Sequence, residues 1–403
     1  MTQASTLAPH APKTVEEAGG TRARGRRLRA GRHAWLWALG LFLGARLTGA
    51  AVVAVAADAV GKRPFALLGR SWDSVWYLGI AADGYGRTVQ YPSFLASDLA
   101  FFPLYPGLVR AVTEALPLSG GAAGLLVSWT AAVVAACGIY AVGDRLHGRA
   151  TGAVLVLLWG LLPHSVVLSM AYTEPLLTAC AAWSLYAVLT GRWVWAGVLA
   201  ALAGLSRPNG LAVAAAVLVA AAYEVVRRGQ GVRKVSHRLW TGAALAPVGW
   251  CGFVLWVGGR EGDPLGGYFA VQRRWSSRFD FGHGALRFVR HLLLGHDRFV
   301  FAMTTMIAAV ALVLFALLLL DRPPLPLLVY TAVLLVIALG GDGFFGSKPR
   351  FLLPAFPLLL PVAVALARTA RARPWHATVV VGALAGLSYV YGAFLVVVNQ
   401  VPL

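Results

Sequence analysis

One acidic residue stands among aromatic side chains near the start of the chain, in a pattern that suits proton transfer close to a membrane surface. Asp73 is flanked by Trp72, Trp76 and Tyr77. If residues 72–82 form a helix, this acid shares one face with two of the aromatic residues, because residues three and four apart are neighbours on a helix. Tryptophan and tyrosine prefer headgroup depth, where partial loss of water makes a carboxylate a better proton acceptor. The spacing alone favours the simpler alternative that Asp73 only caps the helix.

The elements that must position this acid are predicted to be transmembrane helices. Charged residues make up 13% and hydrophobic residues 59% of the 403-residue chain, whereas soluble domains carry about 25% charged residues. This composition excludes a soluble globule, a disordered protein and a disulfide scaffold. It predicts an all-α polytopic membrane protein with about eleven spans, at residues 34–57, 120–143, 150–169, 172–190, 193–206, 208–226, 239–258, 299–320, 325–340, 351–367 and 376–398.

Basic residues outside the apolar runs predict the orientation of this bundle. Cytoplasmic segments are enriched in lysine and arginine, and seven such residues lie between Lys13 and Arg32, ahead of the first run. The N-terminus is therefore expected in the cytoplasm and the protein in the plasma membrane. This distribution accounts for the net charge of +19 without a nucleic-acid partner. Residues 1–33 are expected to form a basic, disordered cytoplasmic tail in contact with membrane lipids, and residues 34–403 a transmembrane catalytic domain.

Two predicted outer loops are longer than simple connections need to be. They cover residues of about 58–119, which include Asp73, and 259–298. Long loops on a rigid scaffold often carry function, and aromatic residues predict interfacial helices in both. The active site is therefore expected on the extracytoplasmic face, where cytoplasmic nucleotides are absent.

Six motifs in a fixed order resemble the PIG-V-type mannosyltransferases, which belong to the GT-C group of multispanning glycosyltransferases. The resemblance covers nearly all of the chain after residue 34. Its motifs are WDSVWYLGIAADGY (72–85), FFPLYP (101–106), PHSVVLSMAYTEPLL (163–177), SRPNG (206–210), GDPLGGYFAVQRRW (262–275) and SKPRFLLPAFPLLL (347–360).

This resemblance implies a GT-C-type helix bundle and an inverting sugar transfer. Enzymes of the group move a sugar from a polyprenyl- or dolichyl-phosphate carrier to an acceptor hydroxyl, with an acid of the first outer loop as general base. Asp73 occupies that position. One carboxylate suffices because the lipid phosphate leaves as a stable anion, whereas soluble inverting glycosidases need two. The resemblance implies a hexose, with mannose as the expectation; a glycolipid, a polysaccharide and a protein all stay open as acceptors.

The leaving phosphate needs cations or aligned hydrogen-bond donors. Arg207, Lys348 and Arg350 each stand at a predicted outer helix end beside a matched motif. Arg207 and Asn209 flank a predicted break, where the N–H groups of the next helix favour anions. The simpler alternative for Lys348 and Arg350 is that they only extend toward the interface.

The remaining candidates each have a structural alternative. Tyr172 and Glu174 begin a span, where an acid is stabilised by the helix dipole; Glu174 could instead bind a sugar hydroxyl or orient the general base. Asp83 is a possible second acid, but Asp-Gly also forms turns. Asp263 is expected to cap a helix with Pro264 at its first position. In the same motif Gln272, Arg273 and Arg274 could face the acceptor or the lipid headgroup.

No metal and no cofactor are expected. Acidic and histidine residues in the second loop suggest a metal site, but no pair among them has the i, i+4 spacing typical of metal ligands. These residues are Asp280, His283, His291, His296 and Asp297.

A transporter or lipid flippase of the cell envelope is the competing hypothesis. The predicted span count, the helix break at 207–210 and Arg46 within the first span suit transport. We expect Arg46 to meet an acid or a cluster of carbonyl groups inside the bundle. The chain lacks the repeated pair of broken helices typical of transporters, and the acidic aromatic loop lies away from the bilayer midplane. A non-catalytic scaffold of a glycosyltransferase complex is a third hypothesis.

Overall fold

Helices form nearly all of the regular structure in the computed structural model, which describes residues 15–92, 94–227, 236–294 and 299–399, without the side chains of residues 15–33, 293 and 294. The predicted all-α fold class is confirmed. Two short antiparallel ribbons were not predicted: β1 (Thr88–Gln90) pairs with β2 (Leu95–Ser97), and β3 (Arg278–Phe279) pairs with β4 (Gly341–Asp342).

Every predicted apolar run contains a helix, but not every helix is long enough to cross a membrane. Among the described residues six helical segments pass by length and composition. They are Ala34–Ala59 of α1 (Val15–Ala59), α5 (Gly120–His147), Pro208–Arg227 with α9 (Leu211–Arg227), His237–Arg260 with α10 (His237–Leu245) and α11 (Val248–Arg260), α14 (Phe299–Leu320), and Pro374–Val398 with α18 (Pro374–Ala393).

The other apolar helices are shorter or bent. A seventh span is possible as a pair bent by 73°, which contains α16 (Lys348–Leu352) and α17 (Leu360–Ala372). Four helices of 10–17 residues remain, α6 (Arg149–Gly160), α7 (Glu174–Leu189), α8 (Trp193–Ser206) and α15 (Leu325–Gly340). A 12-residue helix such as α6 is only about 18 Å long, so the eleven-span count stays a prediction. The domain boundary near residue 34 also stays a prediction, since α1 begins at Val15 and residues 1–14 lie outside the described part.

Two of the predicted spans are interrupted helices, which is a correction to the continuous runs 150–169 and 351–367. Prolines cause both interruptions, because they lack an N–H and clash with the preceding turn. After α6, Pro163 precedes a 3₁₀ turn, η2 (Ser165–Ser169); Pro354 and Pro357 separate α16 from α17. Side chains bond carbonyls at the second break: the Trp159 indole donates to Leu353 O at 3.0 Å and the Tyr330 hydroxyl to Pro354 O at 2.8 Å.

Arg46 lies in the core of the bundle and meets one carbonyl and two serine hydroxyls, rather than the expected acid or cluster of carbonyl groups. It is 2% exposed. Its guanidinium donates to Gly160 O at 2.8 Å, to Ser165 Oγ at 2.6 Å and to Ser169 Oγ at 3.1 and 3.2 Å. These contacts tie α1 to α6 and to η2, which leads directly into Tyr172 and Glu174.

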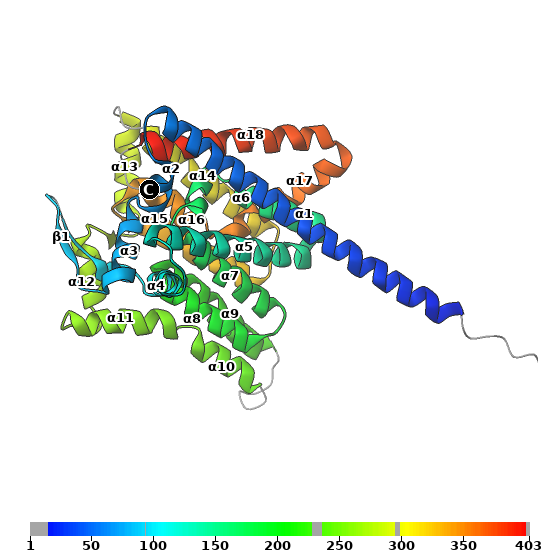
Figure 1. The fold of residues 1–403 in the computed structure, drawn as a ribbon. Coiled ribbons are helices and arrows are strands. Elements are labelled where there is room, and N and C mark those ends of the chain that lie inside the picture. The colour runs from blue at the N-terminus through cyan, green and yellow to red at the C-terminus, as the bar shows by residue number, and fades with distance from the viewer. Residues whose placement is uncertain (1–14, 93, 228–235, 295–298, 400–403) are drawn as a thin grey trace, which may run out of the picture.

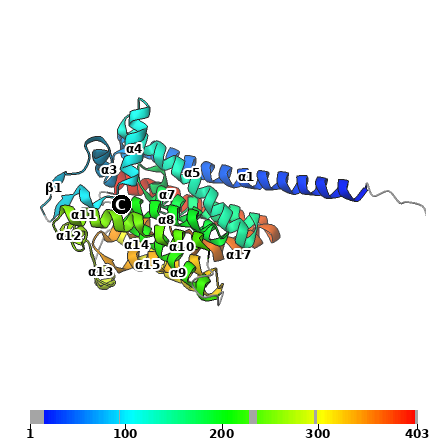
Figure 2. The same cartoon turned by 90° about the horizontal axis from the view of Figure 1, so that it is seen from below.

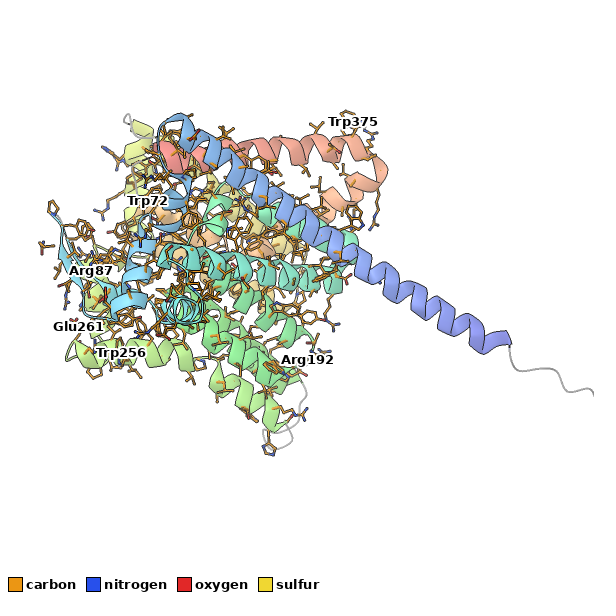
Figure 3. All side chains as sticks on the ribbon, in the orientation of Figure 1. Trp72, Arg87, Arg192, Trp256, Glu261 and Trp375 are labelled. Atoms are coloured by element: carbon orange, nitrogen blue, oxygen red, sulfur yellow. The ribbon has the colours of Figure 1, made fainter. Side chains whose placement is uncertain are left out.

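The two long loops gather at one end of the bundle, opposite the start of α1 (Figures 1 and 2). The first loop contributes α2 (Pro64–Gly69), α3 (Asp73–Asp83), the β1–β2 hairpin, η1 (Asp98–Ala100) and α4 (Leu104–Ala115). The second contributes α12 (Gly267–Arg274), β3 and α13 (His283–Leu294). Figure 3 shows Trp72, Arg87 and Glu261 at this end and Arg192 and Trp375 at the other. The two loops therefore share one side, as the predicted topology requires.

Candidate active site

Asp73 is the first residue of α3 and points away from the helix it begins. Trp72 is the N-cap residue, and no side chain makes a capping hydrogen bond there. The expected helix and its face are confirmed, since Trp76 and Tyr77 are buried. Trp72 has a φ of 52°, an uncommon conformation for a bulky residue that is held by its surroundings. The capping alternative for Asp73 is therefore wrong.

Asp73 belongs to a network of four charged side chains. Arg350 Nη2 lies 2.7 Å from Asp73 Oδ2, and Arg350 Nε lies 3.7 Å from Glu174 Oε1. Glu174 also pairs with Arg207 Nη1. The side chains of Glu174, Arg207 and Arg350 are between 1% and 8% exposed, and that of Asp73 is 18% exposed. Charges this deeply buried need partners, and two acids facing two arginines leave the network neutral.

Local backbone features bring these side chains together from distant parts of the chain. Glu174 begins α7, where Pro175 suits the first turn because its missing N–H would be unsatisfied there anyway. Arg207 is extended between α8 and the 3₁₀ turn η3 (Pro208–Gly210), so the predicted helix break is confirmed. A Cβ at Gly210 would lie 2.1 Å from Ala203 O, and only glycine permits that approach.

Aromatic rings pack against the two arginines of the network. The Arg350 guanidinium lies 5.3 Å from the ring centre of Tyr172 and 5.1 Å from that of Phe351, and the Arg207 guanidinium lies 5.3 Å from the ring of Phe351. Such cation–π contacts are strengthened by loss of water. The backbone N–H of Asp73 also donates to the Tyr172 hydroxyl at 3.4 Å. Tyr172 therefore contacts both partners of the Asp73–Arg350 pair.

Tyr77 completes the inner wall as a neutral group. Its hydroxyl lies 3.3 Å from Thr173 Oγ1. Burial raises the pKa of Tyr77 to about 12, against the opposing effect of Arg207 and with support from the charges of Asp73 and Glu174. The phenol keeps its proton at neutral pH and serves as a hydrogen-bonding group rather than as a base.

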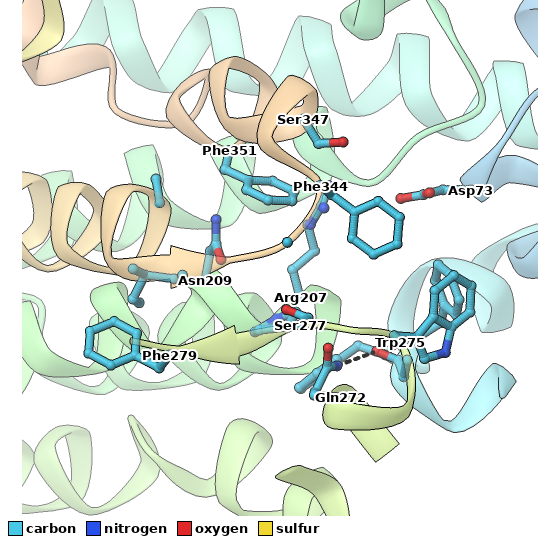
Figure 4. A pocket seen from close by; sticks show the side chains of 18 of the residues that line it. Asp73, Arg207, Asn209, Gln272, Trp275, Ser277, Phe279, Phe344, Ser347 and Phe351 are labelled. Carbon is cyan, nitrogen blue, oxygen red and sulfur yellow. Dashed lines mark hydrogen bonds between the residues drawn. The ribbon is translucent and has the colours of Figure 1, made fainter. Parts of the chain in front are cut away.

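The network opens into a cavity of about 1010 Å³ between the two long loops and α15. Figure 4 shows Asp73, Arg207, Gln272 and Trp275 around it. Asp73 Oδ1 makes no hydrogen bond to any described residue, whereas Oδ2 is held by Arg350. One carboxylate oxygen is thus fixed and the other is available to a ligand.

Aromatic contacts join the two long loops at the mouth of the cavity. Trp76 stacks on Phe101 with ring centres 5.7 Å apart and meets the edge of Trp275 at 5.2 Å. The Trp275 indole donates to Ser97 O at 2.9 Å, and the Gln272 amide donates to the Tyr268 hydroxyl at 2.8 Å. The mouth is therefore a largely apolar surface with a few fixed polar groups, typical of ligand pockets.

The structure brings most of the predicted site residues to this cavity and places the others elsewhere. Its lining includes Trp72, Asp73, Trp76, Tyr77, Arg207, Asn209, Gln272, Lys348 and Arg350. Tyr172 and Glu174 lie behind the lining, in contact with the arginines. Asp83 is exposed at the end of α3, before Gly84 with a φ of 81°, in agreement with the turn alternative.

Asp263 and Lys348 have structural contacts. Asp263 Oδ1 accepts the N–H groups of Leu265 at 3.3 Å and Gly266 at 2.9 Å. It therefore holds a turn, and the helix begins at Gly267 rather than at the expected Pro264.

Lys348 Nζ donates to three carbonyls at the end of α15, those of Ala338 at 3.0 Å, Leu339 at 3.4 Å and Gly341 at 2.6 Å.

The sequence interpretation missed Asp98. This residue is 1% exposed, and its Oδ2 accepts the N–H groups of Gly86 and Arg87, each at 2.8 Å. These hydrogen bonds hold the residue that follows β2 close to the segment between α3 and β1. The only signal for it in the sequence is its place three residues before the FFPLYP motif.

Asp280 and His283 of the second loop contact backbone atoms of the same loop. Asp280 Oδ1 accepts the N–H of Gly282 at 3.0 Å, and His283 Nδ1 lies 2.8 Å from Asp280 O. His296 and Asp297 lie outside the described residues. Within the described part of the chain, no three histidine, cysteine or acidic residues are grouped as metal ligands would be.

The chain shares its fold with solved structures of other proteins. The chain is similar to ArnT from Cupriavidus metallidurans bound to undecaprenyl phosphate, with 15% identity and a TM-score of 0.53 over 89% of this chain and 76% of that one. It is also similar to the apo form of the Archaeoglobus fulgidus oligosaccharyltransferase, with 13% identity and a TM-score of 0.51 over 90% of this chain and 56% of that one. The chain thus spans just over half of the oligosaccharyltransferase. No protein-family model and no curated protein matches the sequence, so membership of the PIG-V family stays a prediction.

Proposed function

We propose that this protein is an extracytoplasmic glycosyltransferase that moves a hexose, with mannose as the first candidate, from a polyprenyl-phosphate carrier to an acceptor hydroxyl. The observation that carries this proposal is the carboxylate of Asp73, which is held through Oδ2 and presents Oδ1 to a large cavity between the outer loops. The acceptor is a glycolipid, a polysaccharide or a protein.

The proposed reaction is a single displacement with Asp73 as general base. The acceptor oxygen forms a bond to the anomeric carbon while the bond from that carbon to the phosphate oxygen breaks. Attack from the opposite face inverts the anomeric centre. The hydroxyl proton passes to Asp73 Oδ1, and polyprenyl phosphate leaves with the bonding electrons. Arg350 keeps the carboxylate in position, because it holds the other oxygen at 2.7 Å.

An apolar wall favours a lipid-linked donor. Val333, Val336 and Ile337 of α15 line the cavity and share one face of the helix by their spacing. Val336 is 57% exposed, which suits a surface that meets hydrocarbon. The fold is also shared with ArnT, a protein whose structure holds undecaprenyl phosphate. A polyprenyl chain along α15 would bring its phosphate toward the cavity.

Replacing Asp73 tests the mechanism. Asp73→Asn keeps the shape but removes the proton acceptor, so sugar transfer from polyprenyl-phosphate mannose by the purified protein should fall by about 100- to 10,000-fold, the usual contribution of a general base. Asp83→Asn is the matched control, because it is the same change on the same helix at an exposed position outside the cavity. Full activity of Asp73→Asn would exclude this mechanism, and a panel of other polyprenyl-phosphate sugars would identify the donor.

A transporter or flippase is the second candidate function. The observation in its favour is that a pair of helices bent by 73° contributes to the cavity, as broken helices do in transporters. Protein in liposomes would then move a labelled polyprenyl-phosphate sugar across the bilayer without forming a new glycosidic bond. Product formation without such flux favours the transferase.

A further inference from the structure

The cavity has more basic than acidic side chains in its lining. Five basic residues and two acidic residues contribute to it, which are Arg207, Arg273, Arg278, Lys348 and Arg350 against Asp73 and Asp342. The excess of positive charge suits an anionic ligand. Which of the five can bind the anion depends on what each already contacts.

The three inner cations each already contact an acid or carbonyl groups, although Arg350 Nη1 has no hydrogen-bond partner among the described residues. Arg350 pairs with Asp73, and Arg207 pairs with Glu174. Lys348 uses its ammonium group on three carbonyls at the end of α15. A phosphate that took over any of these cations would leave a buried acid or carbonyl without its partner, which is costly in a water-poor site.

Two arginines at the mouth are free of such contacts. Arg273 on α12 and Arg278 on β3 are exposed and line the cavity, and their side chains form no ion pair or hydrogen bond with any described residue. Arg274, between them in sequence, pairs instead with Glu261 and does not line the cavity. Asp342 lies opposite Arg278 in the β3–β4 ribbon, and its Oδ1 accepts the Gly343 N–H at 2.8 Å.

The position of β3 joins Arg278 to the apolar wall. β3 pairs with β4, which follows α15 directly in the chain. The face of α15 formed by Val333, Val336 and Ile337 therefore leads along the cavity to the strand opposite Arg278. An apolar track in a cavity that Arg273 and Arg278 also line is complementary to a molecule with a long hydrocarbon chain and one phosphate.

We propose that Arg273 and Arg278 bind the phosphate of the lipid-linked donor at the mouth of the cavity, with its prenyl chain along α15. This inference rests on the proposed function for the identity of the ligand, but not for its charge or its apolar chain. It replaces the expectation that Arg207, Lys348 and Arg350 take the phosphate, and assigns Arg207 and Arg350 to holding Glu174 and Asp73.

Binding of farnesyl phosphate to the purified full-length protein tests the assignment without any sugar transfer. Arg273→Gln/Arg278→Gln should weaken binding by about 10- to 100-fold, since hydrogen bonds between charged groups contribute this much. Binding of uncharged farnesol should not change. Arg274→Gln is the matched control and should bind farnesyl phosphate as the unaltered protein does.

Three results would overturn the assignment. They are unchanged binding by the double variant, no binding by the unaltered protein, and equal loss in Arg274→Gln. Competition also identifies the source of the phosphate. Inorganic phosphate or phosphatidylglycerol that displaces the probe as well as unlabelled farnesyl phosphate would overturn a site for a prenyl phosphate. Because no transfer is measured, an active Asp73→Asn would refute the proposed reaction and leave this result intact.

Discussion

Glu174 is the residue on which both inner arginines depend. Its side chain is 1% exposed, and its carboxylate pairs with Arg207 and lies 3.7 Å from Arg350. Without it, two guanidinium groups would face a single acid, Asp73, in a site with little water. The arrangement gives Glu174 a positioning role, since it fixes the arginine that holds Asp73 while lying outside the cavity lining.

Replacing this acid should destabilise the protein and the site together. Glu174→Gln leaves Arg207 buried without a counter-charge, and breaking a buried ion pair from one side costs about 3–5 kcal/mol. We expect a lower melting temperature in detergent. The double variant Glu174→Gln/Arg207→Gln should recover part of the loss, because no unpaired charge remains. A loss in the double variant equal to the sum of the losses in Glu174→Gln and Arg207→Gln alone would show that the pair is not coupled.

The same pairing predicts that transfer does not depend on a divalent cation. Asp73 and Glu174 are the two acids of the network, and both are bound by arginine. A metal ion would have to displace Arg350 or Arg207 to reach them. Treatment with EDTA should therefore leave the rate of sugar transfer within about twofold of the untreated rate, a change of less than one RT unit in free energy. Loss of activity that added Mg²⁺ or Mn²⁺ restores would contradict this prediction.

At the scale of elements, the break between α8 and α9 decides where Arg207 points. Arg207 is extended, with a φ of −162°, and η3 turns the chain directly into α9. Gly210 makes this sharp turn possible because its α-carbon lies against the carbonyl of Ala203. The short helix α8 thus ends at the cavity, which Ser206 and Arg207 line.

A methyl group at this break should displace Arg207. In Gly210→Ala the new Cβ would lie 2.1 Å from Ala203 O, so the backbone must shift, and overpacking of this kind costs about 1–3 kcal/mol. We expect a lower melting temperature and a larger fall in sugar transfer than the loss of folded protein explains. Gly252→Ala on α11 is the control, since nothing lies within 4 Å of its added Cβ. Equal behaviour of the two variants would contradict this role of the break.

The elements that could be predicted from the sequence are those with a local signal. The face of α3 follows from helical periodicity at Trp76 and Tyr77, and the break at Arg207 follows from Pro208 and Gly210. The contacts of Lys348 with the end of α15 and the pairing of β3 with β4 could not be predicted in this way. They join segments that meet only in the folded chain, and a two-residue strand has no periodicity to detect. The ion pairs of Asp73 and Glu174 could not be predicted for the same reason, because their arginine partners meet them only in the folded chain.

At the scale of the whole molecule, the bundle has two distinct ends. The end with α3, α12 and α13 holds the cavity, whereas Arg192 and Trp375 mark the opposite end (Figure 3). The expected cytoplasmic side, with its basic connections, is the end from which α1 enters. A donor with its sugar on the outer leaflet can reach the cavity only if the loop end faces outward, so the proposed function requires one orientation.

Labelling of introduced cysteines tests that orientation. Asp83→Cys and Arg192→Cys replace exposed residues at the loop end and the opposite end. They are introduced separately into a background in which Cys137, Cys180 and Cys251 are alanine. A membrane-impermeant maleimide added to intact cells should label Asp83→Cys, whereas Arg192→Cys should react only after the membrane is opened. The reverse pattern would place the cavity in the cytoplasm, next to the inner leaflet. An extracytoplasmic carrier could then no longer be the donor, even if Asp73 proved to be essential for activity.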